Sequence, residues 1–495
     1  MNLAFDPYIL LGIAPDVSTE DIKAAYRRIA LRLHPDRNPN PGAAVQLQDI
    51  NQAHTLLLDP AQRSAYDRTR HERINPAHPE FLLRVTPSKR YVQTLPEPQV
   101  IYLLAEIYTE QSTTSEAEER SREARLNLTI VMDRSNSMSG TRLDRVKSAA
   151  NQIIDGLTPN DIFSFIAFND FAEVVIDAGP AQNLAVMKSR ISMLTASGGT
   201  EILRGLKLGV EQNKKHQQNE RVNHIIMLTD GNTYGDQDEC MLLAQAVAKE
   251  GIGISALGIG QEWNDEFLDT LTSTTGGVAE YVKNINTVQR FLDDHVRSLA
   301  NTFAERLILS IAPDPDVKVE SAFKLSPRPQ PLVSDRATIA LGNLQYHRMT
   351  SLLFQLELPA SQNAGFRSIA RIAVQGDILS QGAKSYMTVS DLSLGISNDA
   401  EPEDPPANVL DALGRLTLYR MQERAKEALD RGDVKEATRR LENLATRLFE
   451  HGEEALGQQA LAEARKVSHT STLSEEGRKA LKYQTRSLLL NSGET

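Results

Sequence analysis

Hydrophobic and polar positions follow different periods in different parts of this chain, and each period predicts its own structure. Between residue 126 and about residue 300, near-continuous apolar runs alternate with stretches that carry one apolar face. Buried strands separated by amphipathic helices are typical of a doubly wound α/β domain, whose parallel sheet is covered on both faces. We expect this domain over residues 126–302, with its strands at Leu126–Met132, Ile162–Phe168, Val174–Ile176, His224–Thr229, Ile252–Leu257 and Val278–Val282.

An alternating pattern on either side of this region predicts a β-sandwich. Leu352, Phe354, Leu356 and Leu358 alternate with polar neighbours within residues 303–397, and Pro-rich turns separate several such runs. Two more strand-like runs, at 81–87 and 99–108, precede the α/β region. We therefore expect the α/β domain to be inserted between strands of one sandwich. Residues 81–125 would supply its first strands and then a charged, Ser/Thr-rich segment, 109–125, that we expect to be mobile.

Helical spacing marks both ends of the chain. Ser18 and Asp21 form a variant capping box ahead of an apolar stripe, and a second helix follows a polar loop, which predicts an all-α unit over residues 1–70. Residues 71–80 and 398–407 have the composition of linkers. Asp433 and Glu436 form a second capping pair, and residues 408–495 are predicted to form a helical hairpin or bundle.

Composition limits the classes of partner. The net charge of −11 and the 24 % charged content argue against non-specific binding to nucleic acid. The single cysteine, Cys240, excludes an intramolecular disulfide framework and a Cys-rich zinc module. The amino-terminal residues lack the features of a signal peptide, and no run approaches the ~18 apolar residues of a membrane helix. We expect a cytoplasmic protein with neither a nucleic acid nor a membrane as its partner.

Hydroxyl and carboxylate side chains follow the predicted strands of the α/β domain. Asp133, Ser135 and Ser137 come directly after one strand, Thr200 follows two glycines, and Asp230 follows another strand. Open α/β sheets bind ligands beyond the carboxyl ends of their strands. A site with only oxygen donors favours Mg²⁺ or Mn²⁺, and Ca²⁺ less. Such an ion keeps exchangeable waters, so we expect it to accept an acidic side chain from a protein ligand.

This constellation resembles the metal-ion-dependent adhesion site of von Willebrand factor A domains. The resemblance covers residues 126 to about 300 and implies Asp133, Ser135, Ser137, Thr200 and Asp230 as the metal ligands. Asn136 stands where many bacterial relatives have Gly, and Glu201 stands where Asp is frequent. Neither residue would supply a coordinating atom in that family.

Residues 5–67 resemble a J domain, the module with which DnaJ-like co-chaperones stimulate ATP hydrolysis by DnaK-type heat-shock chaperones. The residues that match the family are Tyr8, Leu11, Gly12, Tyr26, His34, Pro35, Asp36, Ala53, Asp59, Arg63, Tyr66 and Asp67. The resemblance implies that the tripeptide His34-Pro35-Asp36 contacts the chaperone. The basic side chains of the preceding helix form a cationic face that can bind an acidic chaperone surface, namely Lys23, Arg27, Arg28 and Arg32.

The residues leave three functions open. The first is a co-chaperone adaptor, in which the J domain recruits a DnaK-type chaperone and the metal-dependent domain binds a protein ligand. The second is a metal-dependent scaffold whose J domain is inactive. The third is a metal-dependent hydrolase, which the sequence supports least, since it contains no His-Glu-x-x-His, Gly-x-Ser-x-Gly or Gly-Lys-Ser/Thr motif. We therefore expect a binding protein without catalytic residues.

Overall fold

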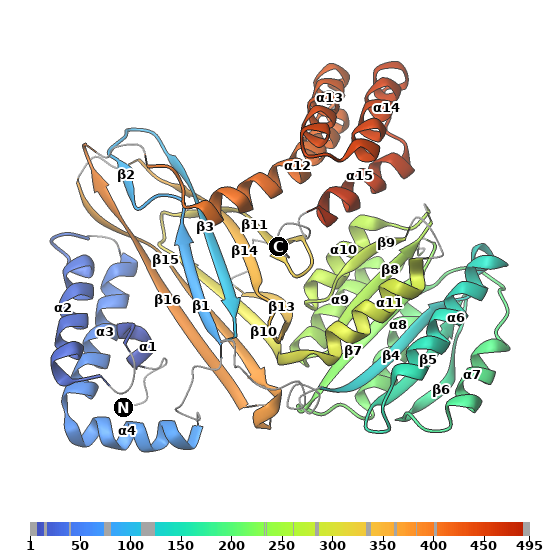
Figure 1. The fold of residues 1–495 in the computed structure, drawn as a ribbon, viewed down its shortest axis with the longest axis horizontal. Coiled ribbons are helices and arrows are strands. Elements are labelled where there is room, and N and C mark those ends of the chain that lie inside the picture. Colours follow the sequence, from blue (N-terminus) through green and yellow to red (C-terminus); the bar gives the residue numbers. More distant parts are fainter. Residues whose placement is uncertain are drawn as a thin grey trace.

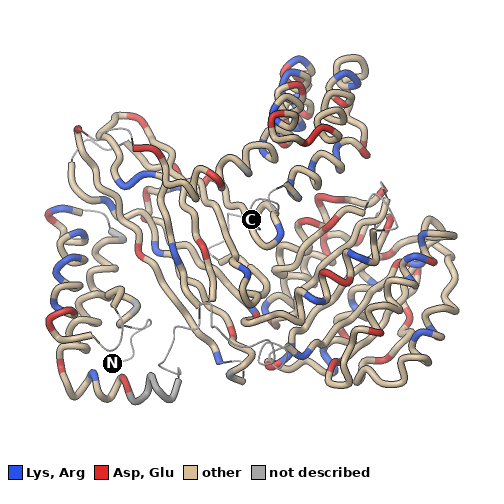
Figure 2. Tube along the Cα trace, in the orientation of Figure 1, with Lys and Arg blue, Asp and Glu red and all other residues tan. Residues whose placement is uncertain are grey.

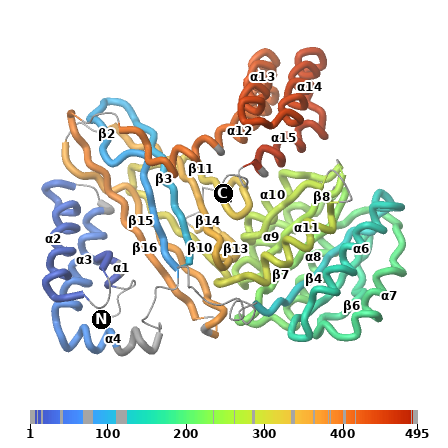
Figure 3. Tube along the Cα trace, viewed as in Figure 1, coloured from blue at the N-terminus to red at the C-terminus, as the bar shows by residue number. Residues whose placement is uncertain are grey.

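The computed structural model places the elements of the chain around a central β-sandwich (Figures 1 and 3). It describes residues 7–13, 17–38, 41–73, 81–109, 124–231, 233, 235–260, 262–282, 287–332, 338–360, 364–382, 384–399 and 403–488. Our predictions of linkers at 71–80 and 398–407 and of a mobile segment at 109–125 lie partly or largely outside these residues. Within the described ranges, no helix combines the length and the apolar character needed to cross a membrane.

The N-terminal unit is all-α, as predicted. Its helices are α1 (Pro7–Leu11), α2 (Thr19–Leu33), α3 (Pro41–Leu58) and α4 (Pro60–Arg73). The predicted capping box starts α2: the Ser18 hydroxyl accepts a hydrogen bond from the Asp21 backbone N–H, and the Asp21 carboxylate accepts one from the Ser18 N–H. Ile22 and Ile50 are fully buried where α2 meets α3.

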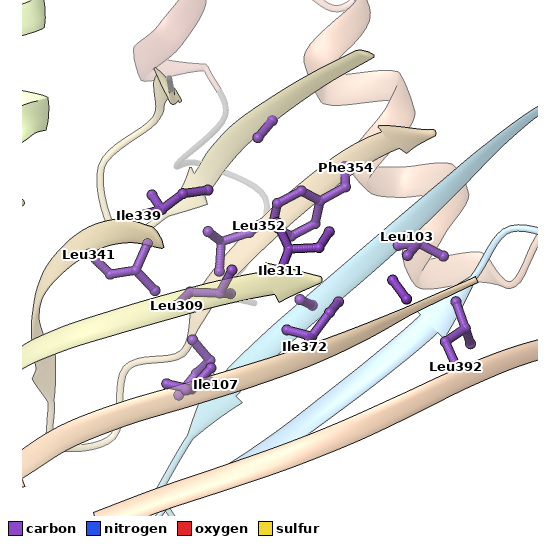
Figure 4. Close-up of a cluster of buried hydrophobic side chains, with 14 of the residues drawn as sticks. Leu103, Ile107, Leu309, Ile311, Ile339, Leu341, Leu352, Phe354, Ile372 and Leu392 are labelled. Atoms are coloured by element: carbon purple, nitrogen blue, oxygen red, sulfur yellow. The ribbon is translucent and has the colours of Figure 1, made fainter. Parts of the chain in front are cut away.

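The sandwich consists of two sheets whose strands come from both sides of the α/β domain. One sheet has the order β1 (Leu82–Pro87), β3 (Gln99–Tyr108), β14 (Thr350–Leu358), β11 (Lys318–Ser326) and β12 (Gln330–Leu332). The other has the order β13 (Thr338–Gln345), β10 (Thr302–Pro313), β15 (Gly365–Ile378), β16 (Lys384–Ser397) and β2 (Tyr91–Gln93). In the core, Leu103 on β3 pairs with Phe354 on β14 (Figure 4). The predicted insertion is therefore confirmed.

The α/β domain has a six-stranded sheet with helices on both faces. The strand order is β6 (Ala172–Pro180), β5 (Ile162–Phe168), β4 (Arg125–Asp133), β7 (Arg221–Thr229), β8 (Gly253–Ile259) and β9 (Ala279–Val282). The helices are η1 (Asn136–Met138), α6 (Thr141–Gly156), α7 (Leu184–Ser192), α8 (Ile202–Lys214), α9 (Gln237–Lys249), α10 (Asp265–Thr274) and α11 (Val288–Ala300). Five strands are parallel, as expected, whereas the edge strand β6 is antiparallel to β5. Only the short loop 169–171 joins β5 to β6, which is too short for a parallel crossover.

The two ends of the α/β domain lie side by side at the sandwich. Helix α11 ends at Ala300, and after Asn301 the chain enters β10. The Ala124 N–H donates to the Ala300 carbonyl at 2.8 Å, so the chain leaves the domain where it came in. At the start of β7, the Asn223 N–H donates to the buried Glu305 carboxylate of β10 at 2.8 Å. The strands thus begin at the sandwich, and their carboxyl ends face away from it.

The N-terminal unit packs on the same sandwich sheet through β15 and β16 (Figure 1). The Phe366 N–H donates to the Arg37 carbonyl at 3.0 Å, in the loop after α2. Arg371 of β15 binds both Asp49 of α3, at 2.6 Å, and Asp391 of β16, at 2.7 Å. These polar contacts join the unit to the sandwich at more than one point.

The C-terminal helices bridge the sandwich and the α/β domain. They are α12 (Ala407–Asp430), α13 (Val434–Glu450), α14 (Glu454–Thr470) and α15 (Glu475–Ser487), and they form the predicted bundle. The Asp433 carboxylate caps α13 as predicted, by accepting from the Glu436 N–H at 3.0 Å. Tyr419 of α12 packs on Phe323 of the sandwich, while α15 packs on α10 and β9.

Candidate functional site

The predicted metal ligands meet at the carboxyl edge of the α/β sheet. Strands β4 and β7 are adjacent and parallel, so Asp133 and Asp230, which lie at and directly after their ends, lie side by side. The Asp133 carboxylate accepts from the Ser135 N–H at 2.8 Å and from the Thr229 hydroxyl at 2.7 Å. The Asp133 side chain is completely buried, and burial raises its pKa to about 6. A buried carboxylate of this kind is stabilised when a cation binds it.

Hydroxyl groups connect the two carboxylates. The Ser135 and Ser137 hydroxyl oxygens are 2.9 Å apart, and the Ser137 hydroxyl donates to Asp230 Oδ1 at 2.7 Å. The other oxygen of Asp230, Oδ2, accepts from the Arg142 guanidinium at 2.6 Å. Arg142 lies at the start of α6 and also donates to the Ser137 carbonyl at 3.2 Å.

Thr200 reaches the cluster from a third loop. A Cβ atom on Gly231 would lie 3.2 Å from the Thr200 hydroxyl oxygen, so the glycine after Asp230 lets the two loops approach closely. Gly198 and Gly199 make room for a different carboxylate. A Cβ atom on either would collide with the Asp170 carboxylate, which accepts from the Gly199 N–H at 2.9 Å.

The donors at this edge fit a hard divalent cation. Within the described part of the chain, no group of three or more His, Cys, Asp or Glu side chains is arranged to hold a metal. The cluster offers two carboxylates and three hydroxyls, which are the ligand types preferred by Mg²⁺ and Mn²⁺. The structure brings all five predicted residues together, and their role as ligands stays a prediction.

Sequence reasoning missed three residues that arrange this site. Arg142 pairs with Asp230, Thr229 holds Asp133, and Asn169 holds the Thr200 loop by accepting the Glu201 N–H at 3.0 Å through its carbonyl. Thr229 lies at the end of a predicted strand and directly precedes the predicted ligand Asp230, and this position could have pointed to its role. Arg142 and Asn169 act on residues far along the chain, and no local pattern points to them.

The J-like tripeptide lies at the end of α2. His34 is the residue after the helix, and its carbonyl accepts from the Arg37 and Asn38 N–H groups at 2.9 and 2.8 Å. The side chains of His34, Pro35 and Asp36 are exposed, and the Asp36 N–H donates to His34 Nδ1 at 3.2 Å. This tight turn fixes the directions of the imidazole and the carboxylate.

The basic face of α2 divides into an open part and a covered part. Arg27 and Arg28 are exposed and Lys23 is partly exposed, and Figure 2 shows the basic residues along this helix. Arg32 is partly buried, and burial lowers its pKa, while the Asp391 carboxylate of β16 counteracts that effect. Arg32 therefore differs from the other three predicted contacts because it lies close to the sandwich.

Tyr8, Arg63 and Asp67, which also match the J-domain family, lie together in one network. The Tyr8 hydroxyl donates to Asp67 Oδ1 at 2.8 Å and accepts from Arg63 Nε at 2.9 Å. Arg63 also donates to the Val17 carbonyl at 2.9 Å, which ties α4 to the segment before α2. These matching residues therefore maintain the helical unit from positions remote from the tripeptide.

Three family models match separate parts of the chain. The DnaJ domain matches residues 6–67, the von Willebrand factor type A domain matches residues 127–294, and the Sll0103-like C-terminal alpha-helical domain matches residues 407–491. These segments coincide with the N-terminal helices, most of the α/β domain and the C-terminal helices.

Individual relatives agree with this division. Uncharacterized protein sll0103 of a Synechocystis strain is 29 % identical over 343 residues, which cover 68 % of this chain and 81 % of that protein. Chaperone protein DnaJ of Methanosarcina thermophila is 47 % identical over 70 residues, which are 14 % of this chain and only 18 % of that protein. A von Willebrand factor type A structure from Catenulispora acidiphila superposes with a TM-score of 0.65 at 16 % identity, and the match covers 83 % of this chain and 97 % of that one. The chain is thus a protein that joins a DnaJ domain to a von Willebrand factor type A domain and an Sll0103-like helical domain.

Proposed function

We propose that this protein is a co-chaperone adaptor that recruits a DnaK-type ATPase through its J domain and binds a protein ligand through a divalent metal ion on its A domain. One observation carries the proposal: the exposed tripeptide and the metal edge, where Asn136 and Ser137 are exposed, belong to one body, on domains that lie on opposite sides of the sandwich (Figure 1). The two sites can therefore be occupied at once. In this role the protein brings partners together and catalyses no reaction itself.

The way the J domain is attached supports recruitment. It contacts the sandwich through α1, α2, α3 and the Arg37 carbonyl, while the tripeptide and the side chains of Arg27 and Arg28 on α2 stay exposed. Exposed cationic side chains accelerate encounter with an acidic surface. A weak chaperone contact is sufficient here, because a ligand held on the same body is at an effective concentration of roughly millimolar.

The A domain would supply ligand selection. Asp133 and Asp230 would hold the cation, which we propose to be Mg²⁺ or Mn²⁺, with the hydroxyls of Ser135, Ser137 and Thr200. When bound, the ion supplies an exchangeable position for a carboxylate of the ligand. The chain's own residues connect the two carboxylates through hydrogen bonds that run from Asp133 through Ser135 and Ser137 to Asp230.

Single-turnover ATP hydrolysis by a cognate DnaK-type chaperone tests the J-domain half of the proposal. We expect the full chain to accelerate hydrolysis and His34→Gln to abolish the acceleration, since His34 is exposed and its replacement leaves the core of the unit intact. Tyr66→Phe is a matched control within the same unit but away from the tripeptide. If wild type and His34→Gln accelerate hydrolysis equally little, the protein is instead a scaffold with an inactive J domain.

Calorimetric titration with Mg²⁺ and Mn²⁺ tests the metal half. We expect Asp133→Asn to lose most of the affinity, because a neutral amide replaces one of two anionic ligands without changing the side chain's volume. Asp170→Asn is the control, since Asp170 touches the Thr200 loop but is not a predicted ligand. Equal affinity in wild type and Asp133→Asn would refute the ligand assignment.

A further inference from the structure

A large aromatic side chain stands exposed beside the metal edge. Phe171 is 70 % exposed, in the loop that joins β5 to β6. Its strand ends next to the first metal ligand: Asp133 pairs with Phe168 in the sheet, and the Arg134 N–H donates to the Phe168 carbonyl at 2.8 Å. Exposing a phenylalanine to water is unfavourable, and contact with an apolar group of a ligand would remove that cost.

Hydrogen bonds hold the Phe171 loop rigidly against the Thr200 loop. The Asn169 carboxamide oxygen accepts from the Phe171 N–H at 2.9 Å, and the Asn169 N–H donates to the Phe171 carbonyl at 2.8 Å. The Asn169 amide group also donates to the Ser197 carbonyl at 2.7 Å. The backbone at Phe171 is therefore held beside the loop that carries Thr200, which lowers the entropic cost of contacting this residue.

The charges around this edge are already paired. Arg134 binds Glu173 at 3.3 Å, Arg204 binds Glu201, and Arg142 binds Asp230 at 2.6 Å. The Arg204 guanidinium also lies 5.8 Å from the centre of the Phe171 ring. Arg134 and Arg204 have acidic partners that are not proposed metal ligands, so these two arginines offer little to a second carboxylate of the protein ligand. Extra affinity must come from apolar contact.

We propose that Phe171 selects the ligand of the A domain, and that the preferred ligand is a protein segment in which the metal-binding Asp or Glu is flanked by an aromatic or large aliphatic residue. This inference rests on the proposed metal-dependent function and narrows it. The carboxylate binds the ion, and the flanking side chain covers the Phe171 ring and the aliphatic part of Arg204. A polyacidic segment lacks the second contact and binds more weakly.

Selection from a displayed library tests the inference. The peptides carry one fixed central Asp or Glu between randomised positions, bind to the full chain in Mg²⁺ and are eluted with a chelator. We expect aromatic and large aliphatic residues to be enriched beside the fixed carboxylate on wild type but not on Phe171→Ala. Peptides selected on wild type should bind Phe171→Ala about tenfold more weakly or worse. Leu242→Ala is the matched control, since Leu242 is a 66 % exposed apolar side chain on α9 of the same domain.

The possible results separate this inference from the function on which it rests. Metal-dependent enrichment of peptides without any apolar preference overturns the role of Phe171 and leaves the metal-dependent function standing. If no peptides are enriched in a metal-dependent way, the result counts against both the role of Phe171 and the proposed metal-dependent function. A calorimetric loss of Mg²⁺ affinity in Phe171→Ala would show that Phe171 acts by shaping the metal loops and would overturn its role in selection. Self-association of wild type that Phe171→Ala abolishes would assign the side chain to a second copy of the chain and overturn the inference as well.

Discussion

At the scale of single residues, the Asp230 carboxylate has two possible counter-ions. The structure pairs it with Arg142, which is nearly half exposed, whereas Asp230 itself is buried. A metal ion bound by Asp230 must share this carboxylate with the guanidinium or displace it. Arg142 therefore offsets the charge of Asp230 without metal, at the expense of metal affinity.

Replacing Arg142 by Gln should tighten metal binding. An ion pair with a half-exposed arginine contributes about 1 kcal/mol, so we expect Mg²⁺ affinity to rise about fivefold in calorimetric titration. Arg204→Gln is the control, because Arg204 pairs with Glu201, which is not a predicted ligand. Weaker binding in Arg142→Gln would mean that the arginine supports the ligand geometry instead of competing with the ion.

His295 on α11 is a buried base that lacks a hydrogen-bond partner on either ring nitrogen among the described residues. It stacks on Phe291 and lies 5.4 Å from the His224 ring. Burial, with smaller contributions from Arg328 and His224, holds the pKa of His295 well below its ordinary value of 6.5. The folded protein thus contains neutral His295 at pH values where the unfolded chain already binds a proton.

This difference predicts that acid destabilises the A domain through His295. Because the folded-state pKa lies below the unfolded one, the unfolded state binds more protons below pH 6.5, and the free energy of unfolding falls by about 1.4 kcal/mol per pH unit there. His295→Leu removes this loss. The free energy of unfolding of His295→Leu, taken relative to that of wild type, should therefore rise by about 2 kcal/mol as the pH is lowered from 6.5 to 5. Urea unfolding measures this free energy at each pH. The signal is the fluorescence of Trp263, which is the single tryptophan and is buried in the A domain. Parallel pH profiles for the two proteins would contradict the prediction.

At the scale of elements, α15 is attached to α10 by a cluster of buried charges. Asp265 binds Arg478 and Lys482, and Asp269 binds Lys482 and Arg486. Burial alone would raise the pKa of Asp269, but Arg486 and Lys482 together lower it, so the carboxylate is ionised and paired. Lys479 also lies over the Trp263 ring, 4.9 Å from its centre.

Removing one carboxylate from this cluster should release the last helix. In Asp269→Ala the Arg486 charge stays buried without its carboxylate, which costs about 3–5 kcal/mol. We expect a new, early urea transition in Trp263 fluorescence as α15 separates, ahead of unfolding of the A domain. Glu475→Ala should leave the profile nearly unchanged, since Glu475 is the exposed partner of Arg478 and surface pairs contribute at most about 1 kcal/mol. Identical profiles for Asp269→Ala and wild type would show that apolar packing alone holds α15.

The elements also show what could be predicted from the sequence. Capping at Ser18 and Asp433 and the strand Ile162–Phe168 depend on neighbours within a few residues, so they were predicted correctly. Strand β2 was missed, because three residues with one buried side chain produce no periodic signal, and its pairing with β16 is long-range. Four members of the ligand set could be proposed because Asp133, Ser135, Ser137 and Asp230 lie at or after strand ends, whereas the Thr200 loop joins α7 to α8 and follows no strand. Arg142 could not, because its partner lies 88 residues away in the sequence.

At the scale of the whole molecule, the J domain is docked on the sandwich and not merely tethered to it. Arg371 of β15 binds Asp49 of α3, and Val389 of β16 packs on the J-domain core. Docking fixes the direction in which the tripeptide faces. It also places Arg32 of the basic face near Asp391.

A charge swap tests this docking. Asp49→Arg should weaken the docking of the J domain on the sandwich, because the new arginine repels Arg371. We therefore expect a larger radius of gyration in small-angle scattering. Asp49→Arg combined with Arg371→Asp should restore part of the compactness, although Asp391 then faces a new acidic neighbour. Chaperone stimulation should persist in Asp49→Arg because the tripeptide is not involved. No change in scattering would mean that the remaining contacts, such as Phe366 with Arg37, suffice to hold the domain.

The hydrogen bond between Ala124 and Ala300 has a consequence for how such proteins can diversify. The chain enters and leaves the A domain at one point, so the domain is a closed loop inserted between strands of the sandwich. The length of this loop does not affect how the sandwich strands pair. A replacement domain would need neighbouring termini to be inserted at this point, and it would also have to supply a partner for the buried Glu305 carboxylate of β10, which the Asn223 N–H provides here. The A domain is thus a separate unit along the chain but not in its packing, and this limits the domains that could take its place.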